Sequence, residues 1–166
     1  MNLTKKKNSL NKIKNILITG GAGFVGHNLA LQFEKKKFVK KIVCLDNFQR
    51  NGSLNNKKIL LKKKKIKLIK FDCSKKFKNL SKYKFDLILH CASDPSVNTD
   101  NNYKMFQSNL MSTINLLEFA SEQKKKPIIV LFSSSRVYSI NNLKKIKYKK
   151  NKSRLKILNY NKIDGL

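Results

Sequence analysis

Residues 16–26 run Ile-Leu-Ile-Thr-Gly-Gly-Ala-Gly-Phe-Val-Gly, from an apolar strand straight into a glycine turn. Gly20, Gly23 and Gly26 stand three residues apart, and a helix-compatible segment follows them. In this order the first glycine makes the tight turn, the second lets backbone N–H groups approach a phosphate, and the third lets the helix lie close to the strand. Because the N-terminus of that helix faces the negative charge, the segment predicts a unit built to hold a pyrophosphate. An ordinary βα turn without a ligand is the alternative.

An acidic residue in the right place supports the ligand-binding interpretation. Asp46 closes a second apolar strand, Lys41–Leu45, twenty residues after Gly26. A carboxylate there binds a ribose hydroxyl and repels a 2′-phosphate, which favours NAD over NADP as the dinucleotide.

The rest of the chain alternates apolar strands with helical segments. We expect strands at 15–19, 41–46, 66–71, 85–90 and 127–133, helices at 23–36 and 101–123, and a loop with a short helix over 47–65. This alternation predicts an α/β fold of Rossmann type, a doubly wound parallel sheet with strand order 3-2-1-4-5. In the longest helix, an apolar stripe is expected to pack against the sheet: Phe106, Leu110, Ile114, Leu117 and Ala120. We expect a basic lead over 1–14, a dinucleotide-binding domain over 15–140 and an irregular tail over 141–166.

The chain is strongly basic, with 38 Lys and Arg against 9 Asp and Glu and a net charge of +29. One explanation is an AT-rich genome, since Lys, Asn and Ile codons are rich in A and T. The other is a nucleic acid or another anionic partner. The lysines are not interleaved with aromatic residues, and only Arg50, Arg136 and Arg154 are arginine, the better reader of bases. We therefore expect no specific nucleic-acid partner, only nonspecific binding to RNA at low salt.

Three cysteines without a Cys-x-x-Cys pair indicate buried, reduced thiols in a cytoplasmic protein. The only histidines are His27 and His90, so no metal-ligand set is visible. The apolar run from Ile16 to Ile18 is too short for a signal peptide or a membrane-spanning helix.

Polar residues follow each of the later strands, at the edge where a parallel sheet binds ligands. Asp72-Cys73 follows the third strand, and Asp72 is either an acceptor for an adenine amino group or a simple turn residue. His90-Cys-Ala-Ser93 follows the fourth, where small residues let the backbone approach a cofactor; His90 by itself is more typical of a structural histidine. Asn109 lies in the long helix, where its side chain could brace the loop after strand four. Ser133–Tyr138 follows the fifth strand and is either a serine-rich turn or a source of hydroxyls for a substrate.

Together these segments resemble the extended short-chain dehydrogenase/reductases, the family of NAD-dependent sugar-nucleotide epimerases and dehydratases. The resemblance covers 15 to about 140 and rests on Thr19–Gly26, Leu45–Asn47, Phe71–Asp72, His90–Ser93, Asn109–Glu118 and Ser133–Tyr138. Within the family, Asp46–Ser53, Asp94–Val97 and Ser133–Tyr138 look most like CDP-paratose 2-epimerases, also called CDP-tyvelose epimerases.

The resemblance implies a role for each motif. Gly20, Gly23 and Gly26, with Phe24 and Val25 between them, would hold the pyrophosphate of NAD. Asp46, Asn47 and Arg50 would bind the adenosine ribose, and Asp72 with Cys73 the adenine. Cys91, Ala92 and Ser93 would line the central part of the cofactor, and Asn109 is the last of the expected cofactor-binding residues. Ser134 would be catalytic and would form a hydrogen bond with the sugar hydroxyl that is oxidised. The implied partners are a nucleotide-sugar substrate and a second copy in a homodimer.

Two family features are missing. The catalytic Tyr-x-x-x-Lys pair has only one match by spacing, Tyr148 with Lys152, in a lysine-rich stretch that resembles a loop. The C-terminal sugar-nucleotide domain is also absent. We therefore expect the cofactor-binding part of an NAD-dependent nucleotide-sugar epimerase, inactive by itself. The first alternative is a non-catalytic NAD-binding module or half of a split enzyme. A 4,6-dehydratase and a basic nucleic-acid-binding protein are less favoured alternatives.

Overall fold

The computed structural model describes residues 12–94, 102–133, 141 and 144–158. The chain divides into two compact units, Met1–Phe132 and Ser133–Leu166, which are described separately below.

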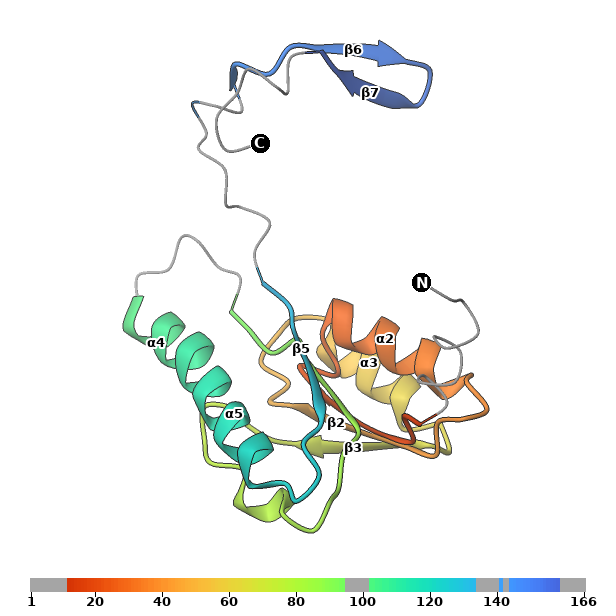
Figure 1. Ribbon diagram of the computed structural model, residues 1–166, viewed down its shortest axis with the longest axis vertical. Helices are drawn as coiled ribbons and strands as arrows, with labels where there is room; N and C mark the ends of the chain where they lie inside the picture. The colour runs from red at the N-terminus through yellow and green to blue at the C-terminus, as the bar shows by residue number, and fades with distance from the viewer. Residues whose placement is uncertain (1–11, 95–101, 134–140, 142–143, 159–166) are drawn as a thin grey trace. The chain divides into compact units, whose positions relative to one another are not determined.

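The first unit contains a five-stranded parallel sheet (Figure 1). The order is β3-β2-β1-β4-β5, as the sequence predicts. Its strands are β1 (Asn15–Thr19), β2 (Lys41–Asp46), β3 (Ile66–Lys70), β4 (Leu87–His90) and β5 (Ile128–Leu131). Because β1 is central, Ile16 lies opposite Ile42 of β2 on one side and Leu87 of β4 on the other.

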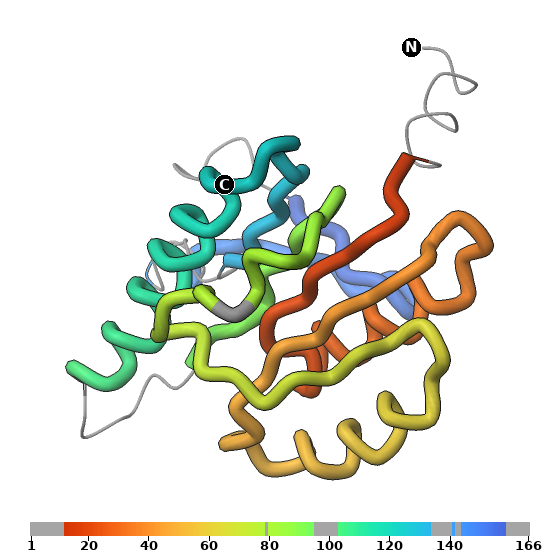
Figure 2. Tube along the Cα trace, turned by 90° about the horizontal axis from the view of Figure 1, so that it is seen from below, coloured from red at the N-terminus to blue at the C-terminus, as the bar shows by residue number. Residues whose placement is uncertain are grey.

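Helices cover both faces of the sheet, and alternate residues of each strand point to opposite faces. On one face, Ile16 and Ile18 pack in a cluster with Ala30 of α2 (Phe24–Glu34) and Leu60 of α3 (Ser53–Leu60). On the other, Leu17 packs in a cluster with Phe77, Leu116 and Phe119. Figure 2 shows the strands running between these two helical layers. The doubly wound arrangement is therefore confirmed, and α3 is the short helix expected between the second and third strands.

The long helix lies where the sequence predicts it, but the predicted buried stripe is wrong. It consists of α4 (Asn102–Phe106), a π-helical segment η2 (Gln107–Met111) and α5 (Ser112–Glu122). Four residues of the expected core stripe are 38–59% exposed, and only Ala120 is buried; the exposed four are Phe106, Leu110, Ile114 and Leu117.

A neighbouring face of the helix packs on the sheet instead. Its buried residues are Ser112, Asn115, Leu116, Phe119 and Ala120. Two of them are polar but hydrogen-bonded: Asn115 Nδ2 donates to the Ser74 carbonyl at 2.8 Å, and Ser112 Oγ donates to the Asn109 carbonyl at 3.1 Å. Since a satisfied polar group can be buried at little cost, hydropathy alone selected the wrong face.

The second unit contains a hairpin where an irregular tail was expected. Strand β6 (Tyr148–Asn151) pairs antiparallel with β7 (Arg154–Ile157). The prediction of irregular structure over these residues is wrong. Both strands are short and fully exposed, and only the second of them alternates polar and apolar residues, so the pattern was too brief to indicate a hairpin. The turn uses Lys152 at φ 45°, a left-handed conformation that usually marks glycine or asparagine. Within the described residues, no helix is long and apolar enough to cross a membrane.

Candidate functional site

The glycine turn after β1 adopts a shape that side chains would block. Gly20 has φ +64°, and a Cβ there would lie 2.9 Å from the backbone of Ala92. A Cβ on Gly26 would run into the carbonyl oxygen of Gly20. Gly23 precedes α2 at the N-cap, no side chain caps the helix, and its first turn contains no acidic residue. The backbone N–H groups that open α2 therefore form a cradle that fits an anionic group.

Asp46 ties this turn to the end of β2. It is buried, its Oδ2 accepts from the backbone N–H of Ala22 at 2.9 Å, and its Oδ1 accepts from that of Phe48 at 2.8 Å. The second bond holds Phe48 at φ 60°, an uncommon value for an aromatic residue. A carboxylate has about four acceptor positions, so Asp46 keeps capacity for a ligand hydroxyl while it organises both loops.

The segment after β3 supplies an acid and a buried thiol. Asp72 Oδ1 accepts from both the backbone N–H and the hydroxyl of Ser74, at 3.0 and 2.8 Å. Burial, followed by the charges of Asp72 and Asp46, raises the pKa of Cys73 to about 12. Cys73 is therefore a neutral, protonated side chain near neutral pH.

His90, at the end of β4, is structural. Its Nδ1 lies 2.7 Å from Thr19 Oγ1 and its Nε2 lies 3.2 Å from Thr113 Oγ1. Burial lowers its pKa below 6.5, which favours the neutral ring. Thr19 Oγ1 also accepts from the backbone N–H of Ala92 at 3.2 Å. This chain of bonds joins β1, the loop after β4 and α5.

Asn109 braces the same loop, as expected. Its Oδ1 accepts from the Asp94 backbone N–H at 2.6 Å, and its Nδ2 donates to the Asp94 carbonyl at 3.0 Å. Arg50 forms an ion pair with the Asp94 carboxylate at 2.8 Å, which joins the loops after β2 and β4. Both charged side chains are partly exposed, so this pair contributes little to stability, about 0–1 kcal/mol.

These segments enclose a cleft at the carboxyl ends of β1 to β4, with about 580 Å³ of empty space including the part open to solvent. The lining residues are Gly20, Gly23, Asp46, Asn47, Arg50, Phe71, Asp72, Cys73, Ser74, Cys91, Ala92, Ser93, Ser108 and Ser112. An adjoining cleft shares Gly20 and Gly23 and adds Phe24, Val25 and Gly26.

Most of the residues singled out from the sequence thus lie together. Asn109 does not line the cleft and acts on the Asp94 loop instead. Ser134, the expected catalytic hydroxyl, lies outside the described residues. Sequence reasoning missed Ser74, Ser108 and Ser112. The last two stand one helical turn apart, and the correct helix face would have indicated them.

Tyr148 and Lys152, which have the spacing of the family's catalytic pair, lie on β6 and the following turn. No group of three or more His, Cys, Asp or Glu within the described part of the chain could hold a metal ion.

Comparison with known proteins places this fold and cleft in one family. The model of the NAD dependent epimerase/dehydratase family matches residues 16–156, past the expected limit near 140. The chain is 35% identical over 133 residues to a dTDP-D-glucose 4,6-dehydratase of Dictyostelium discoideum, covering 76% of this chain and 30% of the relative. It is 31% identical over 144 residues to the CDP-paratose 2-epimerase of Salmonella typhi, covering 84% of this chain and 41% of the relative.

Solved structures agree. The ADP-L-glycero-D-manno-heptose-6-epimerase of Helicobacter pylori is 34% identical with a TM-score of 0.65, covering 77% of this chain and 41% of that one. The UDP-glucuronic acid 4-epimerase of Bacillus cereus, solved with UDP-glucuronic acid and NAD, is 26% identical with a TM-score of 0.65. The match covers 75% of this chain and 41% of that one. The chain thus spans between about a third and two fifths of these proteins. It belongs to the NAD-dependent epimerase/dehydratase family.

Proposed function

We propose that this chain is the NAD-binding part of a nucleotide-sugar epimerase. The observation that carries the proposal is the cleft at the carboxyl ends of β1 to β4, assembled from the residues that the sequence singled out. NAD, when bound, would accept hydrogen from a sugar carbon and return it to the other face, for net isomerisation.

The residues of this chain would bind and orient that cofactor. The open N-terminus of α2 would hold the pyrophosphate, since Gly20, Gly23 and Gly26 leave room for it. Asp46 would accept a hydrogen bond from the adenosine ribose on its remaining lone pairs, with Asn47 and Arg50 beside it, and Asp72 would accept one from adenine. Cys91, Ala92 and Ser93 would line the central part of the cofactor.

The finer assignments rest on the resemblance of motifs. Ser134 would hydrogen-bond the sugar hydroxyl, and the substrate would be a CDP-paratose-like nucleotide sugar. A homodimer is the assembly we expect, supported by the exposed apolar side chains of Leu110, Ile114 and Leu117 on one helix. The free thiols Cys44, Cys73 and Cys91 suit the reducing cytoplasm, which is the location we expect.

Calorimetric titration with NAD and NADP tests the cofactor assignment. The folded chain should bind NAD more tightly than NADP, and Asp46→Asn should narrow that preference, because it removes the charge that repels a 2′-phosphate. Asp86→Asn is the matched control, since Asp86 lies at the opposite edge of the sheet, where its carboxylate bonds the N–H groups that open β1. This control should leave the ratio of the two affinities unchanged even if stability falls. Equal affinity of the wild-type chain for both cofactors would overturn the assignment.

A non-catalytic NAD-binding module, or half of a split enzyme, is the second candidate. The observation that favours it is the position of Tyr148 and Lys152 on a hairpin, since the family places its Tyr-x-x-x-Lys pair on a long helix. Reading the coding DNA beyond Leu166 in all frames separates the candidates. A Tyr-x-x-x-Lys helix followed by a sugar-binding domain supports the epimerase, unrelated sequence supports the module, and a separate chain carrying that pair supports the split enzyme.

A 4,6-dehydratase is less favoured, although one relative has that activity. By resemblance, an enzyme with that activity has a Thr-Asp-Glu set after the fifth strand. This chain has Ser134-Ser135-Arg136 at that place.

A further inference from the structure

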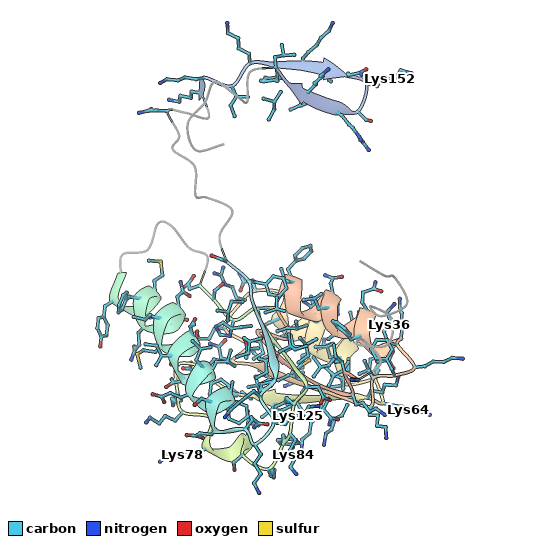
Figure 3. All side chains as sticks on the ribbon, in the orientation of Figure 1. Lys36, Lys64, Lys78, Lys84, Lys125 and Lys152 are labelled. Atoms are coloured by element: carbon cyan, nitrogen blue, oxygen red, sulfur yellow. The ribbon has the colours of Figure 1, made fainter. Side chains whose placement is uncertain are left out.

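Lysines precede every strand of the parallel sheet. We call this set the lysine edge: Lys12 and Lys14 before β1, Lys40 and Lys41 at β2, Lys62–Lys65 and Lys67 at β3, Lys82 and Lys84 before β4, and Lys124–Lys126 before β5. Because all five strands are parallel, these positions meet at the amino end of the sheet, opposite the cleft. Figure 3 labels three of them, Lys64, Lys84 and Lys125.

At the opposite edge, two segments contain no basic residue, although Lys70 ends β3 and Lys75 follows it. Residues 15–34, which include the glycine turn, contain no Lys or Arg, and neither do residues 85–94 with the loop after β4. Of the residues that the structure describes, Arg50 is the one basic residue that lines the cleft, beside Asp46 and Asp72. The glycine turn and the loop after β4 are therefore free of basic residues, whereas each strand of the sheet begins beside lysines.

Three members of the lysine edge converge on one aromatic ring. The Nζ atoms of Lys41, Lys67 and Lys82 lie 4.7, 5.7 and 5.8 Å from the centre of the Tyr83 ring. No two of them can be more than about 11.5 Å apart, close to the screening length of about 10 Å at 0.1 M salt, so they repel one another.

These three charges are not neutralised by neighbours. Within the described residues none of them forms an ion pair with a carboxylate, whereas Lys125 pairs with Asp86 at 2.9 Å. A hydrogen bond from Lys67, together with the charges of Lys41 and Lys82 and against the effect of burial, lowers the pKa of Tyr83.

We propose that the lysine edge binds the phosphodiester backbone of RNA, without sequence specificity and independently of the cleft. Phosphate oxygens relieve the repulsion among clustered ammonium groups and release counterions from the polymer. The Tyr83 ring stacks on Phe85 with centroids 5.9 Å apart, so it holds the lysines in place rather than offering a free platform for bases.

An anionic membrane fits this surface less well. Around the Tyr83 cluster, among the described residues from 62 to 94, no large apolar side chain is exposed. The exposed Leu61 and Ile128 lie beside β3 and β5, the two outer strands of the sheet, and so form no common apolar patch. A membrane-binding surface needs apolar groups to insert beside its basic residues.

The test is fluorescence anisotropy with a 20-nucleotide oligouridylate over a salt series. The test variant is the triple change Lys41→Gln, Lys67→Gln and Lys82→Gln. The control is Lys149→Gln, Lys150→Gln and Lys156→Gln on the hairpin, which removes the same net charge from equally exposed positions. Each lost phosphate contact lowers the salt slope by about 0.7, so the test variant should lose about 2 in slope and on the order of 100-fold in affinity at 0.1 M salt.

The control should lose only a few-fold, and saturating NAD should leave RNA binding unchanged. Equal losses in the two variants would overturn the proposal, because binding would then follow net charge alone. Competition by NAD would overturn the independence of the two sites. Tighter binding to anionic phosphatidylserine vesicles than to RNA, lost in the test variant, would assign the surface to a membrane instead. Failure of NAD binding would bear only on the proposed function and leave this result intact.

Discussion

Two adjacent leucines of α5 provide a sharp test of how this helix packs. Leu116 is 0% exposed and packs in a cluster with Leu17 and Phe119, whereas Leu117 is 43% exposed. The sequence pattern alone predicts the reverse, since Leu117 belongs to the expected core stripe. Leu116→Ala and Leu117→Ala therefore distinguish the two helix faces with the same chemical change at neighbouring positions.

The expected magnitudes differ widely. Removing a fully buried leucine costs about 2–5 kcal/mol, because it loses both transfer free energy and packing. Burial of a whole leucine side chain contributes roughly 1.5–3 kcal/mol to stability. Because the Leu117 side chain is nearly half exposed, its truncation should cost only part of that, about 1 kcal/mol. The gain in helix propensity is the same in both variants and cancels from the comparison. The free energies of unfolding should then differ by about 2 kcal/mol.

Urea denaturation followed by far-UV circular dichroism measures this difference. With a slope of roughly 1–2 kcal/mol/M for a domain of this size, the midpoint of Leu116→Ala should lie about 1 M or more below that of Leu117→Ala. Repeating the measurement at tenfold lower protein concentration reveals any contribution of self-association at the outer face, because the midpoint of a monomer does not depend on concentration. Equal midpoints, or a lower midpoint for Leu117→Ala, would refute the packing described above.

Three further outcomes follow from single residues. Burial alone would raise the pKa of Asp86, but the Lys125 ammonium and two backbone N–H groups bring that pKa below 3.8. The contribution of this carboxylate to the free energy of unfolding is therefore complete above pH 3.8, and it is lost as the pH falls through the pKa of Asp86 in the folded chain. Asp86→Asn should lower the free energy of unfolding at pH 7 by about 2 kcal/mol and flatten its decline in acid, measured by urea midpoints across pH. Because burial lowers the pKa of His90, stability should also fall as the pH drops from 6.5 toward the folded value, and His90→Gln should reduce that slope in the same titration. Asn109→Ala frees the loop at Asp94 and should weaken NAD binding about tenfold by calorimetry while Asn28→Ala, on the surface of α2, does not.

Residues that act through the local chain were predictable from sequence. The glycine turn and Asp46 depend on a strand, a turn and a helix in fixed succession, so their spacing carries their geometry. The bracing role of Asn109 was also predictable, because the start of the helix after β4 must lie beside the loop that leaves that strand. The sheet order followed from right-handed crossovers between parallel strands.

Features that depend on satisfied polar groups were not predictable. Ser112 and Asn115 are buried because each finds a backbone carbonyl in the folded chain, which no hydropathy pattern records. The same error hid Ser108 and Ser112 as lining residues of the cleft. The hairpin was missed because its strands are exposed on both faces and its turn places a lysine at positive φ.

The chemistry of the cleft separates binding from proton transfer. Burial raises the pKa of Cys73 and Cys91 to about 12, so neither thiol is a base at neutral pH, and Asp46 already accepts two backbone N–H groups. His90 has both ring nitrogens engaged and does not line the cleft. Neither thiol nor His90 is therefore a base for the sugar hydroxyl of the proposed reaction. Under the proposed function, the described residues would hold the dinucleotide through their own contacts, and removal of the substrate proton would depend on other groups. NAD affinity and turnover should then respond to different parts of the protein.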